Sequence, residues 1–222
     1  MSLHLSWSIS ALIILALAVW AGYAARKNLV GILIDTRGRF SLNHLQIVMW
    51  TVIILSSIVG VFLARLVAGE ADLMHFAIPQ ELLILMGISV GSATSAGAVK
   101  AAKDIGPSAP KIARVGAVFP VAARARLAQA LAGGAPAAVE HRTIEAHFSQ
   151  VVQEEEGDQG DVSVDVTKFQ NLVFTALAGI AYVVLFWSRG TIDALPPLPN
   201  ELLWLLGISH AGYVAGKLPA KP

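Results

Sequence analysis

Five long apolar stretches set the strongest limit on what this chain can fold into. They contain no Asp, Glu, Lys or Arg, and they are Trp7–Ala25, Leu45–Ala64, Leu82–Val99, Phe169–Phe186 and Leu202–Gly216. A bilayer core of ~30 Å takes roughly 17 to 25 helical residues to cross. Four stretches fit that length, and the fifth is slightly short but ends at Lys217, whose side chain can snorkel to the interface. We therefore predict an all-α integral membrane protein with five transmembrane helices.

Composition agrees with lipid as the solvent of this chain. Of the 222 residues, 55% are hydrophobic and 14% are charged, whereas soluble domains carry about 25% charged residues. A soluble protein this apolar would expose large hydrophobic patches. The chain has no cysteine, which excludes disulfides, thiolate metal sites and cysteine nucleophiles.

The placement of basic residues predicts the orientation in the membrane. If the N-terminus is outside, the inner segments hold 14 of the 16 Lys and Arg residues, and the outer segments hold only Arg65 and Arg189. Positive charge concentrates on the cytoplasmic side of membrane proteins, so we predict an outer N-terminus and a cytoplasmic C-terminus. The basic pair Arg26-Lys27 follows the first apolar stretch, which is typical of a retained first helix rather than a signal peptide.

A motif of eleven residues occurs twice in the chain. Pro79–Ser89 and Pro199–Ser209 are identical at eight of eleven positions, and upstream of them Ser41–Thr51 aligns with Asp165–Thr175. This pattern predicts a tandem parallel repeat of two helices, with the halves related by an axis along the membrane normal. The predicted divisions are a leading helix (1–27), a first repeat half (28–100), a small cytoplasmic segment (101–164) and a second repeat half (165–222).

The cytoplasmic segment has the composition of short elements. Val121–Gly134 is basic and helix-forming, and Pro136–Gly157 predicts a second helix that ends in an acidic run. Asp161–Val166 alternates polar and apolar residues and suits a short strand, and Gly31–Leu42 occupies the same place in the first half. The two alternatives here are a small paired element at the membrane face and an unstructured linker.

Small residues recur every four positions in both motif helices. Such spacing lets helix backbones approach closely where lipid gives no hydrophobic drive for association. We expect this packing between the halves, between subunits, or both, and we predict a homo-oligomer. The helix-packing candidates are Gly87, Gly91, Gly97, Gly207, Gly212 and Gly216.

Polar side chains are few within the apolar stretches. They contain no carboxylate, which argues against a proton- or sodium-coupled transporter. His210 has two interpretations. It is either a titrating group in a pore or a neutral His that bonds to a hydroxyl on a neighbouring helix. The Ser and Tyr hydroxyls in these stretches either line a narrow polar path or form hydrogen bonds between helices. The pore-lining candidates are His210, Ser89, Ser209, Ser92 and Tyr213.

Gln46 and Gln170 are aligned by the repeat. We expect them either to bond to backbone carbonyls of the neighbouring motif helix or to lie at headgroup level.

Common catalytic motifs are missing from the sequence. It has no Walker-type phosphate loop, no Gly-x-Ser-x-Gly elbow and no His-Glu-x-x-His pair. The acidic and His residues of Glu140–His147 predict a solvated face rather than a metal site, and the basic run Ala122–Gln129 lacks the aromatics that favour nucleic acid. We predict no enzyme activity, no cofactor or metal, and no nucleic-acid partner.

The second half resembles a motif pair found in a family of bacterial multi-pass membrane proteins. In that pair, a Phe-Gln…Trp-Thr helix precedes a Pro-x-x-Leu-Leu-x-Leu-Met-Gly-Ile-Ser-x-x-x-Tyr helix that ends near Lys, and Asp165–Lys217 is similar to it throughout. Ser41–Ala98 is similar too, but Ala93 and Gly97 stand where the pattern has Tyr and Lys. The resemblance implies a bacterial cytoplasmic (inner) membrane protein. The family carries no assigned activity, so the resemblance implies no site residues.

Two functional hypotheses follow. The first is an oligomeric channel or pore of unknown selectivity, lined by Leu82–Val99 and Leu202–Gly216. The second is a membrane anchor or scaffold that presents residues 100–168 to a cytoplasmic protein partner. Both have the lipid bilayer and further copies of the chain as partners.

Overall fold

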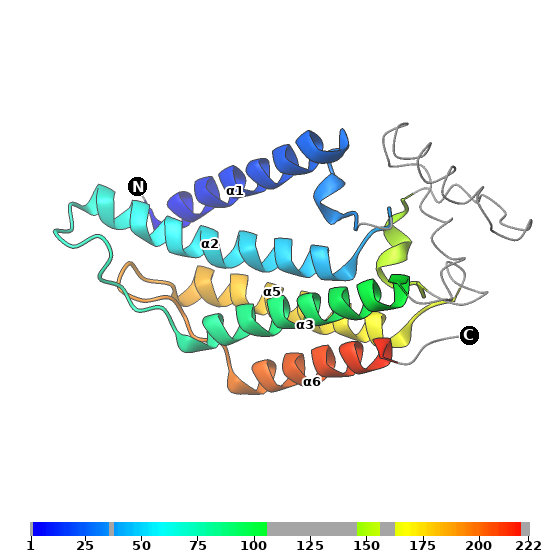
Figure 1. Cartoon of the computed structure of the whole chain (residues 1–222). Coiled ribbons are helices and arrows are strands. Elements are labelled where there is room, and N and C mark those ends of the chain that lie inside the picture. Colours follow the sequence, from blue (N-terminus) through cyan, green and yellow to red (C-terminus); the bar gives the residue numbers. More distant parts are fainter. Residues whose placement is uncertain (1, 36–37, 106–145, 156–162, 219–222) are drawn as a thin grey trace, which may run out of the picture.

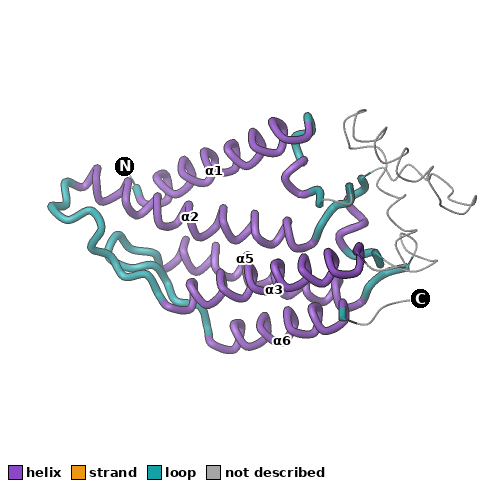
Figure 2. The backbone as a smooth tube through the Cα atoms, viewed as in Figure 1, coloured by secondary structure: helices purple, strands orange, loops and turns teal. Residues whose placement is uncertain are grey.

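Five long helices run side by side and form one bundle (Figures 1 and 2). The computed structural model describes residues 2–35, 38–105, 146–155 and 163–218. The long helices are α1 (Leu3–Arg26), α2 (Leu42–Ala68), α3 (Gln80–Ile105), α5 (Val166–Arg189) and α6 (Asn200–Lys217), and the short 3-10 helices are η1 (Gly31–Leu33) and η3 (Phe148–Val151). The described residues contain no strand beyond three isolated bridges. The predicted all-α class is confirmed.

Four of these helices are long and apolar enough to cross a membrane: α1, α2, α5 and the Gln80–Lys100 part of α3. Helix α6 has 18 residues, about 27 Å at 1.5 Å per residue, but it does not reach that standard because Asn200, Glu201, His210 and Lys217 lower its mean hydropathy. The apolar side chains of α1 mostly face outward, since only 11% of its most apolar window is buried. Helices with so much exposed apolar surface suggest a membrane protein rather than a soluble bundle.

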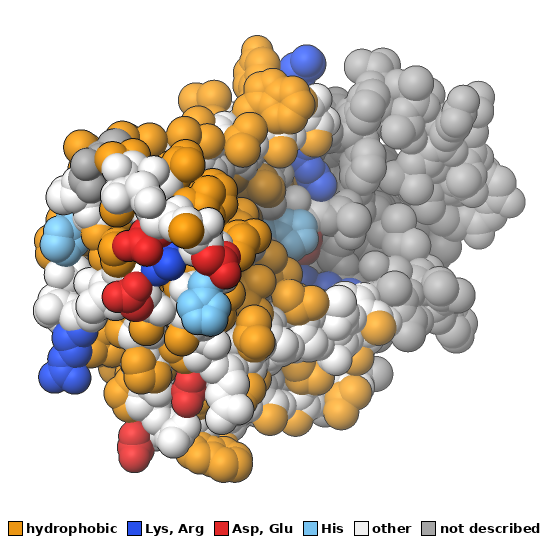
Figure 3. Space-filling view, turned by 90° about the vertical axis from the view of Figure 1, so that its left-hand side faces the viewer, with side chains coloured by type: hydrophobic (Ala, Val, Ile, Leu, Met, Phe, Trp, Pro, Cys, Tyr) orange, Lys and Arg blue, Asp and Glu red, His pale blue; other side chains and the backbone are white. Residues whose placement is uncertain are grey.

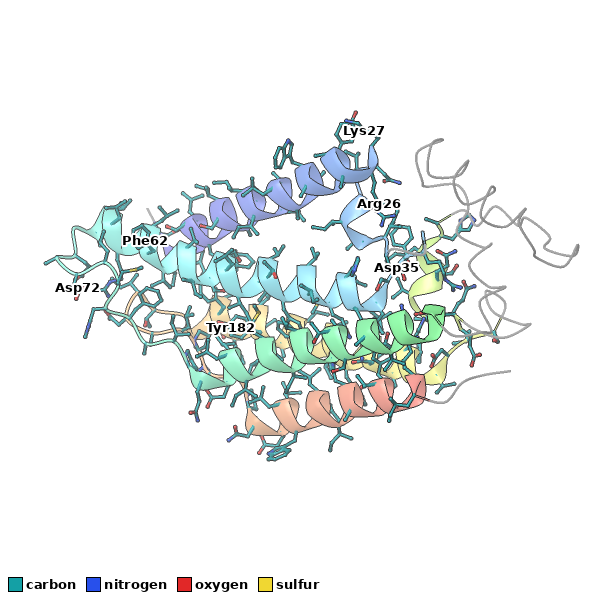
Figure 4. All side chains as sticks on the ribbon, viewed as in Figure 1. Arg26, Lys27, Asp35, Phe62, Asp72 and Tyr182 are labelled. Carbon is teal, nitrogen blue, oxygen red and sulfur yellow. The ribbon has the colours of Figure 1, made fainter. Side chains whose placement is uncertain are left out.

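The bundle has two chemically different ends, which we name the Asp72 end and the Asp35 end after residues labelled in Figure 4. Helices α1, α3 and α6 run toward the Asp35 end, and α2 and α5 return from it (Figure 1). Among the described residues, Arg65 and Arg189 lie in the last turns of α2 and α5, at the Asp72 end. The Asp35 end holds Arg26, Lys27, Arg39, Lys100, Lys168 and Lys217, as the labels of Figure 4 and the contacts with Asp35 and Glu155 show. The predicted topology therefore assigns the Asp35 end to the cytoplasm.

The main core lies between α2, α3, α5 and α6. Trp50, Tyr182 and Leu206 are fully buried in it. Helix α1 packs on the outside of α2, and the contact depends on Gly60: a Cβ atom there would lie 2.8 Å from the Cα of Trp7. A bulkier residue at this position would push the two helices apart.

At the Asp72 end, the two loops between paired helices pair with each other. Ala77 and Ala194 form a parallel bridge. The Arg65 guanidinium, whose side chain is 6% exposed, bonds to the backbone oxygens of Asp72 and Ile192 and lies 2.9 Å from a carboxylate oxygen of Asp193. Figure 3 faces this end and shows a basic side chain among acidic ones. A single arginine therefore fastens both loops to α2.

We expect Arg65→Lys to lower the free energy of unfolding by about 1.5 kcal/mol, the value of one hydrogen bond to a charged group. An ammonium cannot reproduce the planar fork that serves both loops. Thermal unfolding in detergent measures the change. Arg189→Lys, at an exposed site, is the control and should change the unfolding free energy by less than about 0.5 kcal/mol; equal effects would contradict the role given to Arg65.

The part of the cytoplasmic segment that the structure describes differs from two predictions. Instead of a helix continuing to residue 157, residues 148–151 form one 3-10 turn, Val152 lies in a turn, and Gln153 makes an isolated bridge to Val164. Instead of a strand reaching Val166, Val164 makes a single bridge to Gln153, and Asp165 caps α5. The Asp165 side chain accepts hydrogen bonds from backbone N–H groups in the first turn of α5. The helix therefore begins where the alternating pattern predicted a strand. The predicted helix Val121–Gly134 and the region Glu140–Glu145 lie outside the described residues.

Candidate functional site

Residues 146–155, a described part of the segment predicted to be cytoplasmic, dock on the Asp35 end of the bundle, and we call them the docking segment. The side-chain oxygen of Gln150 accepts a bond from the backbone N–H of Phe40 at 3.1 Å, and the guanidinium of Arg39 donates to the carbonyl of Glu154 at 3.0 Å. Val151 is buried in a small second core with Leu42 and other residues of the bundle. Polar and apolar contacts thus hold the segment against the helices.

Three lysines converge on the last described carboxylate of this segment. Glu155 Oε1 lies 2.6 Å from Lys168 Nζ and 3.0 Å from Lys217 Nζ, and its Oε2 lies 2.7 Å from Lys100 Nζ. Lys100 also lies 3.4 Å from the carboxylate of Asp35. We call Lys100, Lys168 and Lys217 the lysine cluster. Because these lysines come from α3, α5 and α6, the carboxylate of Glu155 joins three helices at one point.

These charges are largely removed from water. The exposed fractions of the side chains are 7% for Glu155, 1% for Lys168, 10% for Lys217 and 13% for Lys100. Burial by itself would raise the pKa of Glu155, but the three ammonium groups, Lys100 foremost, outweigh it and hold that pKa well below the ordinary value of 4.5. A pKa that is lower in the folded state stabilises it fully above that ordinary value and ceases to do so as the pH falls through the lowered pKa. The docked arrangement therefore persists at neutral pH.

The positions of the lysines follow from where each helix ends. Lys217 is the last residue of α6, where positive charge is favourable for the helix dipole, and Lys100 lies just before the last turn of α3. Lys168 lies in the first turn of α5, where the dipole opposes it. Its ammonium compensates by donating to the carbonyl of Gln153 at 2.8 Å as well as by pairing with Glu155. The Lys217 ammonium also lies 5.3 Å from the ring centroid of Tyr213.

The predicted pore-lining residues lie inside the single chain, mainly between α3 and α6. The hydroxyl of Ser92 lies 2.6 Å from Nδ1 of His210 and 3.1 Å from the carbonyl of Ser89. If Nδ1 of a neutral His210 has no proton, the Ser92 hydroxyl donates to it. If Nδ1 is protonated, it donates to the Ser92 hydroxyl, which then donates to the carbonyl of Ser89. The exposed fractions are 2% for His210 and 8% for Ser92. This geometry matches the alternative of a His bonded to a hydroxyl on a neighbouring helix.

The other predicted polar residues are buried with differing partners. The hydroxyls of Ser89 and Ser209 are buried without a hydrogen-bond partner, and Tyr213 belongs to the second core with Val151. The amide of Gln46 donates to the hydroxyl of Thr175 at 2.8 Å.

Gln170 differs from its repeat partner because it lies on the exposed side of α5. The repeat therefore aligns Gln46 and Gln170 in sequence but not in environment. The bond of Gln46 joins α2 to α5, the two corresponding helices of the halves, and does not reach a motif helix.

The glycines predicted to pack helices mostly face outward in the single chain. Cβ atoms built at Gly87, Gly91, Gly97 and Gly212 would meet no atom within 4 Å. At Gly207 and Gly216 the nearest atoms are 3.8 Å away, on Ile88 and Thr167 respectively. Close backbone approach within the chain occurs instead at other glycines, including Gly22 and Gly60. Packing of the predicted glycines between subunits stays a prediction.

Sequence reasoning missed the lysine cluster and Glu155 as one site. Two signals pointed to it: a basic residue near the inner end of each of three helices, and an acidic run in the segment returning to the membrane. Neither signal specifies which of several acidic side chains reaches the lysines. Among the described residues, no group of three or more His, Asp or Glu side chains is arranged to hold a metal ion.

Comparison with other proteins adds no relative to this description: no protein-family model matches the chain, and searches of curated proteins and of solved structures find no significant match.

Proposed function

We propose that this chain is a multi-pass membrane anchor that presents the segment between Lys100 and Lys168 to a cytoplasmic protein partner. The observation that carries the proposal is the bonding of Glu155 to lysines of three helices. A segment that merely connected two helices would need no such bonds. Here residues 146–155 are bonded to the bundle, so this end of the segment has a defined position on it.

The anchor has a topology that agrees with its charges. With the Asp35 end in the cytoplasm, the lysine cluster and the docking segment lie at the inner face of the membrane, as the positive-inside rule requires. Helix α6 is the fifth crossing in this proposal, shorter than the others and packed on one side against α3 and α5. The parallel bridge of Ala77 and Ala194 supports the tandem parallel repeat, because corresponding loops of the two halves then run in the same direction.

The alternative is an oligomeric channel, which two observations favour. His210 and Ser92 form a polar pair within helices that are otherwise apolar, and the outward glycines of α3 leave a face on which a second copy can pack. The pair is buried inside one chain, however, so a pore lined by His210 has to open between α3 and α6. We therefore place the anchor ahead of the channel.

One preparation tests both functions. The full chain is purified in mild detergent, its oligomeric state is measured, and the same sample is placed in planar bilayers. We expect no unitary current across voltage and pH. Currents that change in His210→Ala but not in Ser95→Ala, an exposed residue of α3, would contradict the anchor and support the channel.

The anchor also predicts dependence on the presented segment. A partner crosslinked to the full chain in native membranes should be lost when residues 106–145 are deleted, since this deletion keeps Lys100, Glu155 and Lys168. It should be kept in His210→Ala. A partner that is equally retained after the deletion would contradict presentation by this segment.

A further inference from the structure

The lysine cluster and its carboxylate are held by different kinds of structure. The three lysines belong to helices of the bundle, whereas Glu155 follows a single 3-10 turn on an extended segment. Movement of the docking segment would therefore withdraw the carboxylate and leave the three ammonium groups in place. The cations are fixed and the anion is the displaceable part.

The Glu155 carboxylate has fewer oxygen atoms than the cluster has ammonium groups, and less negative charge than the cluster has positive charge. Two oxygens serve three ammonium groups, so Oε1 is shared by Lys168 and Lys217. With Asp35 included, the described groups are three cations and two anions, a balance of +1. A phosphate monoester offers three terminal oxygens and a charge between −1.5 and −2. It can give each lysine its own oxygen and leave the site closer to neutrality.

The surroundings of the cluster place it at the membrane surface. Large apolar side chains next to the lysines in sequence face outward: Val166 is 71% exposed, Phe169 53% and Leu218 63%. Outward apolar residues beside inward lysines, at the ends of membrane helices, are expected where the acyl chains of a lipid meet its headgroup. A phosphate held by the cluster would therefore sit at headgroup depth.

We propose that Lys100, Lys168 and Lys217 form a binding site for the phosphate monoester of an anionic phospholipid of the phosphatidic acid type, and that Glu155 occupies this site as an internal competitor. Lipid phosphate and docking segment then exclude each other at the cluster. Lipid binding releases the segment, and docking closes the site. This proposal is independent of the anchor function, because lipid binding is measured without a protein partner and without a current.

The test measures lipid binding to the full chain in a neutral detergent. Dioctanoyl phosphatidic acid is the probe, and dioctanoyl phosphatidylcholine and inorganic phosphate are the comparison ligands. We expect phosphatidic acid to bind at least about tenfold more tightly than either comparison ligand. Glu155→Gln, which removes the competing charge, should tighten its binding about a hundredfold, and Lys217→Gln should weaken it about tenfold. Arg189→Gln, on the Asp72 side, should leave it unchanged.

Each result decides the proposal. Equal binding of inorganic phosphate would overturn the lipid as ligand, and equal effects of Lys217→Gln and Arg189→Gln would overturn the cluster as the site. Unchanged affinity in a folded Glu155→Gln variant would overturn competition by Glu155. If that variant does not fold, Glu155→Asp replaces it: a shorter side chain that keeps its charge should compete less well and tighten lipid binding, and unchanged affinity would again overturn the competition.

Discussion

Glu155→Lys is expected to lower the free energy of unfolding by about 5 kcal/mol, the upper end of the range for breaking a buried ion pair. The substitution removes the partner of three largely buried ammonium groups and adds a fourth positive charge among them. Their desolvation is then no longer offset. Unfolding in detergent by added SDS, followed through tryptophan fluorescence, measures the loss.

Glu70→Lys is the matched control at the opposite end. The Glu70 side chain is 43% exposed and lies 3.7 Å from Arg65, so its pairing is screened by water and its loss should cost less than about 1 kcal/mol. Adding Lys217→Glu to Glu155→Lys should recover part of the stability, because it restores an opposite charge within the cluster. Equal losses in the two single variants, or no recovery in the double variant, would be incompatible with the site described.

Gly60→Leu is expected to cost about 3 kcal/mol, the upper end of the range for overpacking. The nearest atoms to a new Cβ are backbone and Cβ atoms of Trp7, the closest at 2.8 Å, so no side-chain rotation relieves the clash. Helix α1 must move away from α2. The movement would also disturb the contacts of Trp7 and His4 with the end of α5, including the bond from the His4 ring to the carbonyl of Trp187 at 2.9 Å. Thermal unfolding in detergent measures the effect.

Gly91→Leu controls for side-chain size. A Cβ at Gly91 meets nothing within 4 Å in the single chain, so the stability of the monomer should change by less than about 0.5 kcal/mol. The same variant tests the predicted homo-oligomer, because a leucine on this face would hinder close packing of a second copy. Crosslinking in native membranes should show fewer oligomers than the wild type. Unchanged oligomers would contradict packing through this face, and a monomer destabilised as much as by Gly60→Leu would contradict the described surface.

Much of the fold follows from patterns that sequence displays directly. Long apolar stretches predict helices because in lipid each backbone group must bond within its own segment, and the predicted stretches lie inside helices of the structure. The helices extend further because caps such as Asp165 lie outside the apolar run. The fifth stretch predicts a helix correctly, but polar residues within and beside it make that helix less apolar than the four that can cross a membrane.

The site was less predictable because it depends on contacts over long sequence distances. Lys100 and Glu155 are joined across a segment whose composition reveals no docking, and the structure of residues 148–155 departs from the predicted helix. Spacing every four residues identified glycines in α3 and α6 but could not tell which face of each helix the neighbours occupy. Gly60, which makes a close contact, has the same spacing with Ser56 and Ala64, but it lies in α2, outside the two motif helices. The repeat likewise aligned Gln46 with Gln170, although only the former is buried.

Hydrogen exchange in the docking segment tests most directly whether Glu155 fixes it on the bundle. The backbone N–H groups of Gln150, Val152 and Glu154 donate to carbonyls at 3.0, 3.1 and 3.0 Å within the docked arrangement. We predict that these amides are protected in the full chain and exchange about a hundredfold faster in Glu155→Gln, as a loss of about 3 kcal/mol implies, while the amides of α2 are unchanged. Rapid exchange in the wild-type chain, or equal protection in the variant, would contradict the account.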